Sequence, residues 1–410
     1  MTKGDAVEVA IVGAGIAGAF LAALLGDPSV LLLERLRTGS APPAIATLWP
    51  DALFLLDAIG VGPDLEARQL PRVARVSFAR PDGSRAEGPV PYYLGRDYAI
   101  GPRRATLLSV LHDRVTRSAV KFRRSTRVLS AEWNPRRKQW SVHTQDQAGS
   151  RTVTADVLVA ADGRFSSVAR FMHAHRYDIR TMNNRLRFQY ARVPVGWPLA
   201  SEFRTYHGNS RVAHGFIQPA DSGEVGVGLE GARLIGRRPS FLAELSELER
   251  LHEDCGGLQW LGRSVEVPLG SMWKQRPGIG NSLLIGDAGL YMDPVTGQGV
   301  GNALLSAALA VRAINRFRRQ EGQWREFECE FVSDRDRYTA ADYERASSAG
   351  LFEESTDAPA PAPLASELAT YTNRTLPDGT PRELDIWLRD LLPPAIASVG
   401  TRLEDDNELG

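Results

Sequence analysis

Cysteine is nearly absent from this chain of 410 residues, and the chain carries no net charge. Its only cysteines are Cys255 and Cys329, too few for a disulfide framework and not at the spacing of a metal site. Lysine plus arginine number 49, as do aspartate plus glutamate, so the charge balance favours neither nucleic acid nor an anionic membrane as a partner. We therefore expect no metal centre and no nucleic-acid partner.

Long apolar runs are missing too. No uninterrupted apolar stretch is long enough to span a bilayer, and residues 1–5 lead directly into a strand-like segment rather than a signal peptide. Two isolated cysteines are typical of a protein from a reducing compartment. We expect a cytoplasmic protein without stable membrane insertion.

The remaining composition is that of an ordinary globular protein, with 43% hydrophobic and 24% charged residues. The first 34 residues contain a strand at 7–12, a helix at 17–25 and a second strand at 30–33. A strand–helix–strand unit of this length implies a parallel sheet with a right-handed crossover. The fold class that we predict is α/β.

In the rest of the chain, helix-like and strand-like segments alternate. Helices are predicted at 50–60, 104–116, 239–252, 299–318 and 322–345. Strands are predicted at 157–160, 264–269 and 282–285, with a hairpin-like segment at 120–155 and a mainly β layer at 185–232. A Pro/Ala connector covers 357–363, and 364–402 is expected to form helix and loops.

This order predicts a Rossmann-like domain built from discontinuous segments. Its expected pieces are 1–75, 100–182 and 275–345, with an inserted β-rich domain from 76–99 and 183–274. Residues 346–410 are expected to form a helical C-terminal cap.

A glycine-rich turn follows the first strand. Gly13-x-Gly15-x-x-Gly18 opens the helix at 17–25, and Glu34 ends the next strand. In a dinucleotide fold the first glycine makes the tight turn, the second admits a pyrophosphate and the third lets helix and strand pack closely. An acidic residue at the position of Glu34 can accept hydrogen bonds from ribose hydroxyls, which favours FAD or NAD over NADP. A glycine turn beside a surface glutamate is the alternative.

Two further junctions have the same character. Asp162-Gly163 and Gly286-Asp287 each follow a strand, and the segment 286–299, GDAGLYMDPVTGQG, leads into a long Ala- and Leu-rich helix. Taken alone, each motif fits an ordinary turn as well as it fits a ligand-binding junction. The N–H groups near Gly297–Gly299 can nevertheless stabilise negative charge at a helix start.

Together, in this order and at these distances, the three motifs resemble those of the FAD-dependent aromatic hydroxylase superfamily, the p-hydroxybenzoate-hydroxylase-like single-component monooxygenases that also include flavin-dependent halogenases. Arg104, in RATLLSVL, matches a helix start whose arginine contacts FAD in that family. The resemblance implies FAD as cofactor, with contacts from Gly13, Gly15, Gly18, Glu34, Arg35, Arg104, Asp162, Gly163, Gly286, Asp287, Pro294, Gly297, Gln298 and Gly299.

The resemblance also implies a reaction. NAD(P)H, docking transiently, would reduce FAD, and O2 would then give a flavin C4a-hydroperoxide that hydroxylates or epoxidises an aromatic or polyketide-like small molecule, as in secondary metabolism. In this family the nicotinamide is expected to dock without a nucleotide-binding domain of its own.

Some residues depart from the family pattern. Gly289-Leu290 stands where Ala-His is common, and Ala169 stands where an arginine is common. Two alternatives therefore stay open: a halogenase that takes FADH2 from a partner flavin reductase, and a non-redox FAD-binding cyclase or binding protein. An active-site lysine beyond the flavin would support a halogenase, and Lys274, before the third motif, is the candidate for it.

The substrate is expected between the flavin and the β layer. Alternation along RLRFQYARV places Arg187, Gln189 and Ala191 on one face and Leu186, Phe188 and Tyr190 on the other, without indicating which face meets the ligand. Candidates for the substrate pocket are Trp49, Gln189, Arg204, Met292 and Pro294. Weak candidates for an acid or base are Tyr206, His207 and His214.

Overall fold

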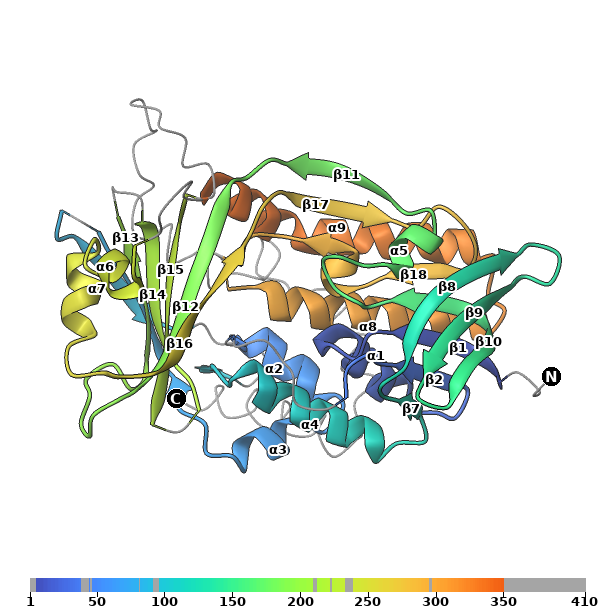
Figure 1. Cartoon of the computed structure of the whole chain (residues 1–410), viewed down its shortest axis with the longest axis horizontal. Coiled ribbons are helices and arrows are strands. Elements are labelled where there is room, and N and C mark those ends of the chain that lie inside the picture. Colours follow the sequence, from blue (N-terminus) through green and yellow to red (C-terminus); the bar gives the residue numbers. More distant parts are fainter. Residues whose placement is uncertain are drawn as a thin grey trace, which may run out of the picture.

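The computed structural model describes residues 5–37, 44, 46–80, 82–90, 96–208, 212–221, 223–232, 239–294 and 297–349. The expected connector at 357–363, the segment 364–402 and nearly all of the expected cap lie outside these residues. Two large sheets organise the described chain, and they stand at opposite ends of the molecule in Figure 1.

The first sheet is the α/β sheet, with the strand order β7-β2-β1-β10-β9-β8 and β18 paired to β10. Its strands are β1 (Asp5–Val12), β2 (Val30–Leu33), β7 (Lys121–Arg123), β8 (Arg127–Asn134), β9 (Gln139–Asp146), β10 (Gly149–Ala160) and β18 (Ser282–Leu284). The strands β7, β2, β1, β10 and β18 run parallel, whereas β8 and β9 extend the sheet in antiparallel fashion. The sheet thus combines strands from distant parts of the chain, as predicted.

Three helices cover one face of this sheet. They are α1 (Ile16–Leu25), α4 (Arg104–Thr116) and α8 (Gly299–Arg318). Helix α1 consists almost entirely of Ala, Gly, Leu, Ile and Phe, because it is enclosed by the sheet, α4 and α8. The largest apolar core of the described chain lies between these helices and the sheet.

The second sheet is the β layer, ordered β16-β12-β15-β14-β13-β4-β5. Its strands are β4 (Arg75–Ala79), β5 (Arg85–Pro89), β12 (Asn184–Arg192), β13 (Glu202–His207), β14 (Val212–Pro219), β15 (Glu224–Ala232) and β16 (Gln259–Pro268). All pairings are antiparallel except that of β4 with β13. The strand predicted at 264–269 is therefore part of a longer one, β16.

Two short helices, α6 (Phe241–Leu245) and α7 (Glu249–Asp254), replace the single helix predicted at 239–252. They cover the outer face of the β layer (Figure 1). The break comes at Leu248, whose backbone leaves the helical region and whose side chain is buried in the same apolar cluster as Leu251. Burial of both leucines against the sheet outweighs the continuity of one helix.

Smaller elements connect the two sheets. A three-stranded sheet contains β11 (His175–Arg180), β17 (Met272–Arg276) and β19 (Leu290–Tyr291), and a short ladder pairs β3 (Arg72–Val73) with β6 (Ala99–Ile100). The remaining helices are α2 (Pro50–Asp57), α3 (Gly62–Glu66), α5 (Val168–Phe171), α9 (Trp324–Ala349) and the 3-10 helix η1 (Gly286–Ala288). The α/β sheet draws on the segments predicted for the Rossmann-like domain, and the β layer draws on those predicted for the β-rich domain. The boundaries of the two domains stay a prediction.

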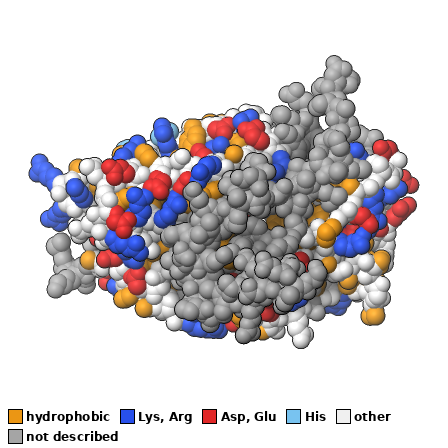
Figure 2. Space-filling model, turned by 180° about the vertical axis from the view of Figure 1, so that it is seen from behind, with side chains coloured by type: hydrophobic (Ala, Val, Ile, Leu, Met, Phe, Trp, Pro, Cys, Tyr) orange, Lys and Arg blue, Asp and Glu red, His pale blue; other side chains and the backbone are white. Residues whose placement is uncertain are grey.

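The described surface shows no grouping of charge by sign on the face seen in Figure 2, where basic and acidic side chains are interspersed. Among the helices of the described residues, none is both long and apolar enough to cross a membrane.

We expect Trp140→Ala to lower the free energy of unfolding by about 3–5 kcal/mol, because it empties a large core site. Trp140 is fully buried, packs on Trp133 and Gly280, and donates its indole N–H to the carbonyl oxygen of Asn281 at 2.9 Å. Urea denaturation measures the change. Leu129→Ala on the neighbouring strand is the control, and its effect should stay within about 0.5 kcal/mol because Leu129 is largely exposed.

Candidate functional site

The turn between β1 and α1 has two glycines that the fold requires and one that it does not. Gly13 has φ = +104°, and a Cβ there would lie 2.4 Å from the carbonyl oxygen of Ala161. A Cβ on Gly18 would lie 1.9 Å from the carbonyl oxygen of Gly13. Gly15, in contrast, has an ordinary φ of −67° and open space where a Cβ would stand. The N-terminus of α1, which has no side-chain cap, is therefore accessible to an anion.

Glu34 lies beside this turn. Its two carboxylate oxygens accept hydrogen bonds from the backbone N–H groups of Ala14 and Leu36, both at 2.8 Å. Each oxygen keeps a further lone pair with which it can accept a ribose hydroxyl. Arg35, the next residue, is exposed.

His112 on α4 is a contact that the sequence analysis did not identify. Its Nε2 lies 2.7 Å from the carbonyl oxygen of Ala14, and its Nδ1 lies 3.3 Å from Arg124 Nη1. Burial lowers the pKa of His112, so the neutral ring can donate from Nε2 and accept at Nδ1. Its place on the helix predicted at 104–116 did not indicate that it would face the glycine turn.

The second junction follows β10. Gly163 has φ = +83°, which a glycine adopts easily. The Asp162 carboxylate accepts hydrogen bonds from Ser166 Oγ and from the backbone N–H of Ser167 at 2.8 Å and of Val168 at 3.3 Å. In this structure it therefore organises the start of α5, and its predicted contact with the cofactor stays a prediction.

The third junction passes close to α1. Gly286 has φ = +55°, a Cβ there would lie 3.0 Å from Ala17 Cβ, and its N–H donates to Ser306 Oγ at 2.9 Å. Asp287 follows it. Its side chain is exposed and lines the cavity described below.

Asp287 faces two arginines. Burial raises the pKa of Asp287, and the positive charges of Arg104 and Arg164 act in the opposite direction. Arg104 begins α4, and its buried Nε has no hydrogen-bond partner in the described part of the chain. A small cavity of about 20 Å³ lies beside this group, and its lining includes Gly286, Asp287, Met292, Gly299 and Asn302.

The loop after β19 leads into α8, whose N-terminus, like that of α1, has no side-chain cap. Pro294 and Gly299 are exposed, whereas Gln298 is buried. Gly297 has φ = +63° and packs against the indole of Trp49, whose Nε1 would lie 3.4 Å from a Cβ at that position. Trp49 lies beside the loop that contains Met292 and Pro294. The predicted role of these three residues in the substrate pocket stays a prediction.

The β layer has two faces of different character. The outer face, toward α6, α7 and β16, carries Gln189, Arg204 and Tyr206. These side chains do not lie toward the loop after β19. Gln189 donates to the carbonyl oxygen of Gly262 at 3.0 Å. The structure does not bring these three candidates to the cofactor loop.

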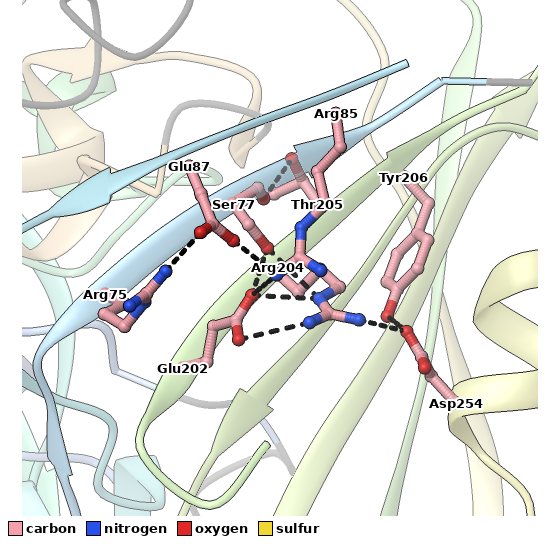
Figure 3. A network of polar contacts seen from close by, with 9 residues as sticks. All are labelled: Arg75, Ser77, Arg85, Glu87, Glu202, Arg204, Thr205, Tyr206 and Asp254. Carbon is pink, nitrogen blue, oxygen red and sulfur yellow. Dashed lines mark hydrogen bonds and ion pairs between the residues drawn. The ribbon is translucent and has the colours of Figure 1, made fainter. Parts of the chain in front are cut away.

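Figure 3 shows the outer-face network around Arg204. The guanidinium donates to Glu202 at 2.9 Å and to Asp254 at 2.7 Å, and Tyr206 donates its O–H to the same Asp254. Burial, followed by the neighbouring Asp254, raises the pKa of Tyr206 far above its usual range. A phenol held in this state is not a base near neutral pH, and the network stabilises the sheet against α7.

The inner face turns toward the α/β sheet. Thr47 on the way to α2 donates to Gln218 at 2.9 Å, Tyr190 donates to the carbonyl oxygen of Ala44 at 2.8 Å, and Trp49 stacks edge-on against Phe203. The strand register places Phe188, Gly228, Phe216, Thr205 and Phe78 in one row across this face.

A second row on the inner face, one register step away, contains Leu186, Glu230, His214 and His207. His207 and His214, predicted as weak candidates, therefore lie on the face that turns toward the cofactor loop. Glu230 was not identified from the sequence, because nothing in EVGVGLEG distinguishes an inward from an outward glutamate.

With this geometry in place, comparisons with known proteins become informative. A family model described as the FAD binding domain matches residues 6–214, just over half of the chain. The chain belongs to this family. Within it, the chain is a member of the FAD-dependent aromatic hydroxylase superfamily and an FAD-dependent oxidoreductase.

Individual relatives are distant but cover most of the flavoprotein. A menaquinone reductase of Mycobacterium tuberculosis is 26% identical over 327 residues, covering 77% of this chain and 78% of that protein. The FAD-dependent monooxygenase penE of Penicillium thymicola is 26% identical over 346 residues, covering 75% and 70%. The structure of the myxobacterial chondrochloren halogenase CndH matches with a TM-score of 0.73 at 17% identity, over 95% of this chain and 97% of that one, which shows a shared fold alone.

The flavoprotein's own residues fit FAD. Open space at Gly15 and the uncapped start of α1 suit a pyrophosphate, and Glu34 suits a ribose. Arg104, with a buried nitrogen lacking a partner, and the cavity-lining Asp287 suit the polar chain of the flavin.

We expect Gly15→Ala to weaken FAD binding roughly tenfold or more, because the added methyl group occupies the space that a pyrophosphate needs. The stability of the apoprotein should change by less than about 0.5 kcal/mol, since a Cβ at this position meets nothing within 4 Å. Titration of apoprotein with FAD, followed by flavin fluorescence, measures the first quantity and thermal unfolding the second.

Gly18→Ala is the matched control, because its Cβ would collide with the carbonyl oxygen of Gly13 at 1.9 Å. It should destabilise the apoprotein itself. Equal stability losses for the two variants would contradict the different roles that we assign to the two glycines.

Proposed function

We propose that this flavoprotein is a monooxygenase that takes electrons from NAD(P)H and inserts one oxygen atom of O2 into an aromatic or polyketide-like small molecule. The observation that carries the proposal is the proximity of the cofactor-binding loop to the inner face of the β layer. Asp287, Asp293, Arg164 and Glu230 all act on the pKa of Tyr291, so the third glycine junction and the β layer meet there. Membership of the FAD-dependent monooxygenase family and the similarity to penE support the same reaction.

The residues of this chain have three tasks in such a reaction. The starts of α1 and α8, with Glu34, Arg104 and Asp287, hold the cofactor, which supplies the redox and oxygen chemistry when bound. Phe216 is half-buried and stacks on the buried Phe203 at 6.1 Å, so its ring offers an apolar face to a planar substrate. Enclosure between the two sheets excludes water from the reacting groups.

A halogenase is less well supported, because Lys274, the lysine that would support one, forms contacts elsewhere. Lys274 forms an ion pair with Asp178 at 2.8 Å and lies 4.6 Å above the ring of Tyr343 on α9. Of the four lysines in the sequence, Lys121 lies on edge strand β7 and Lys138 in the exposed turn between β8 and β9. In the described part of the chain, no lysine reaches the inner face of the β layer.

We expect Lys274→Met to leave reduction of the flavin and substrate-coupled O2 consumption within about twofold of wild type, and to cost roughly 1 kcal/mol of stability. Hydrogen bonds from Lys274 and Arg180 outweigh burial and lower the pKa of Asp178. That stabilisation is present at neutral pH and is lost as the pH falls below about 4, so the stability difference between variant and wild type should shrink in acid. Loss of turnover with intact flavin reduction would instead place Lys274 in the chemistry.

The proposal itself is tested by mixing the purified holoprotein anaerobically with NADPH or NADH and following flavin absorbance. Bleaching by either nucleotide, followed by substrate-stimulated O2 consumption in air, is the expected result. A flavin that neither nucleotide reduces would contradict the proposal and favour a partner reductase or a non-redox role for FAD.

A further inference from the structure

A larger cavity lies away from the cofactor junctions, between α2, α3 and the short ladder of β3 and β6. Its volume is about 240 Å³, and none of its described lining residues belongs to the three glycine junctions or to the β layer. An apolar cavity of about 150 Å³ holds benzene, whereas drug-sized ligands occupy about 300–1,000 Å³. This cavity therefore has room for one ring with a short substituent.

The floor of the cavity is apolar. It is formed by Leu53 on α2, Leu65 on α3 and Ile100 on β6, all of them buried. The three side chains belong to the largest apolar core of the described chain. The apolar part of a ligand would extend the packing of that core, and removing it from water is favourable.

The rim of the cavity carries charges of both signs. Arg72 is exposed, its guanidinium lies 4.2 Å from the centre of the Tyr98 ring, and no carboxylate among the described residues pairs with it. Glu66 is exposed as well. Its Oε1 accepts hydrogen bonds from Tyr98 at 3.3 Å and from Arg96 at 3.4 Å, which leaves the second oxygen able to accept from a ligand.

Arg96 also lines the cavity, but its charge is already neutralised. Its Nη2 lies 2.6 Å from Asp57 Oδ2 and 2.8 Å from Oδ1, and its Nε donates to Oδ2 at 3.0 Å. A bidentate pair of this kind leaves little attraction for a further anion. Arg72 is therefore the cation, and Glu66 the anion, with which a ligand can pair.

A rim with one charge of each sign favours a ligand without net charge. A monocarboxylate would pair with Arg72 but would bring its negative charge close to Glu66. An amine would pair with Glu66 but would bring its positive charge close to Arg72. A zwitterion with an apolar side chain satisfies both residues and the floor.

We propose that this cavity binds an apolar α-amino acid. Its carboxylate pairs with Arg72, its ammonium group pairs with Glu66, and its side chain packs on the apolar floor. The cavity is separate from the candidate cofactor and substrate sites, so the inference does not depend on the proposed oxygenation.

The first test compares three probes that share one ring: 4-fluorophenylalanine, 3-(4-fluorophenyl)propanoate and 2-(4-fluorophenyl)ethylamine. Each is titrated with the oxidised holoprotein, without reductant, and binding is followed by the broadening of its fluorine NMR signal. The zwitterion should bind at least about threefold more tightly than either singly charged probe, as expected for ion pairs at an exposed rim.

The second test exchanges the charge preference. Arg72→Gln should weaken binding of the zwitterion about threefold and make the amine the tightest probe, because only the anion of the rim remains. Glu66→Gln should weaken it by a similar factor and make the propanoate the tightest probe. Arg127→Gln and Glu132→Gln, both at exposed positions on β8, are the matched controls and should leave every affinity within about 1.5-fold of wild type.

A third variant tests the location. Leu70 lines the cavity and is half-buried, so the larger ring of Leu70→Trp would occupy the space of the ligand. Binding of all three probes should then fall by about tenfold or more. Near-UV circular dichroism checks the fold of this variant, and the two charge variants test the site without altering its apolar floor.

Three results would overturn the inference: no broadening of the zwitterion signal at millimolar concentration, equal affinities of the three probes for wild type, or affinities that Arg72→Gln and Glu66→Gln leave unchanged. The last result would place the bound amino acid elsewhere on the flavoprotein.

Discussion

The parallel register of three strands is the constraint on which the candidate site depends. Strand β10 pairs with β1 on one side and β18 on the other, so that Val12, Ala160 and Leu284 lie level. The backbone continues this alignment one residue further, because Ala161 donates to Val12 and Ile285 to Ala160. Each glycine junction begins where its strand ends. Three motifs separated by more than a hundred residues in sequence therefore meet at one edge of one sheet.

This constraint explains why so much of the cofactor side could be predicted. Buried parallel strands are short apolar runs bounded by glycine, and helices such as 104–116 and 299–318 begin and end as the sequence indicates. The positions of Gly13 and Gly18 are fixed by contacts with backbone atoms, which leave a strong signal in the sequence. His112 left no such signal, because its role depends on a contact between α4 and Ala14 that only the packing of α1 against α4 creates.

The substrate side was less predictable for a physical reason. A period of two assigns the residues of a strand to two faces, but both faces of the β layer are buried, one by α6 and α7 and the other by the α/β part. The burial of a side chain therefore does not indicate on which face it lies, and polar residues occur on both faces. Arg204 and Tyr206 are as polar as His207 and His214, yet they pair with Glu202 and Asp254 beneath α7. Only the register distinguishes the two sets.

The two faces of the β layer also differ in the partners of their buried carboxyl groups. On the outer face, each buried carboxylate meets an arginine, as Glu244 does with Arg185 and Arg187, and these ion pairs hold strands and helices together. On the inner face, Glu230 meets another acid and a neutral imidazole, an arrangement that contributes no ion pair to stability. The difference between the faces, rather than any single residue, supports the proposal that the substrate binds at the inner face.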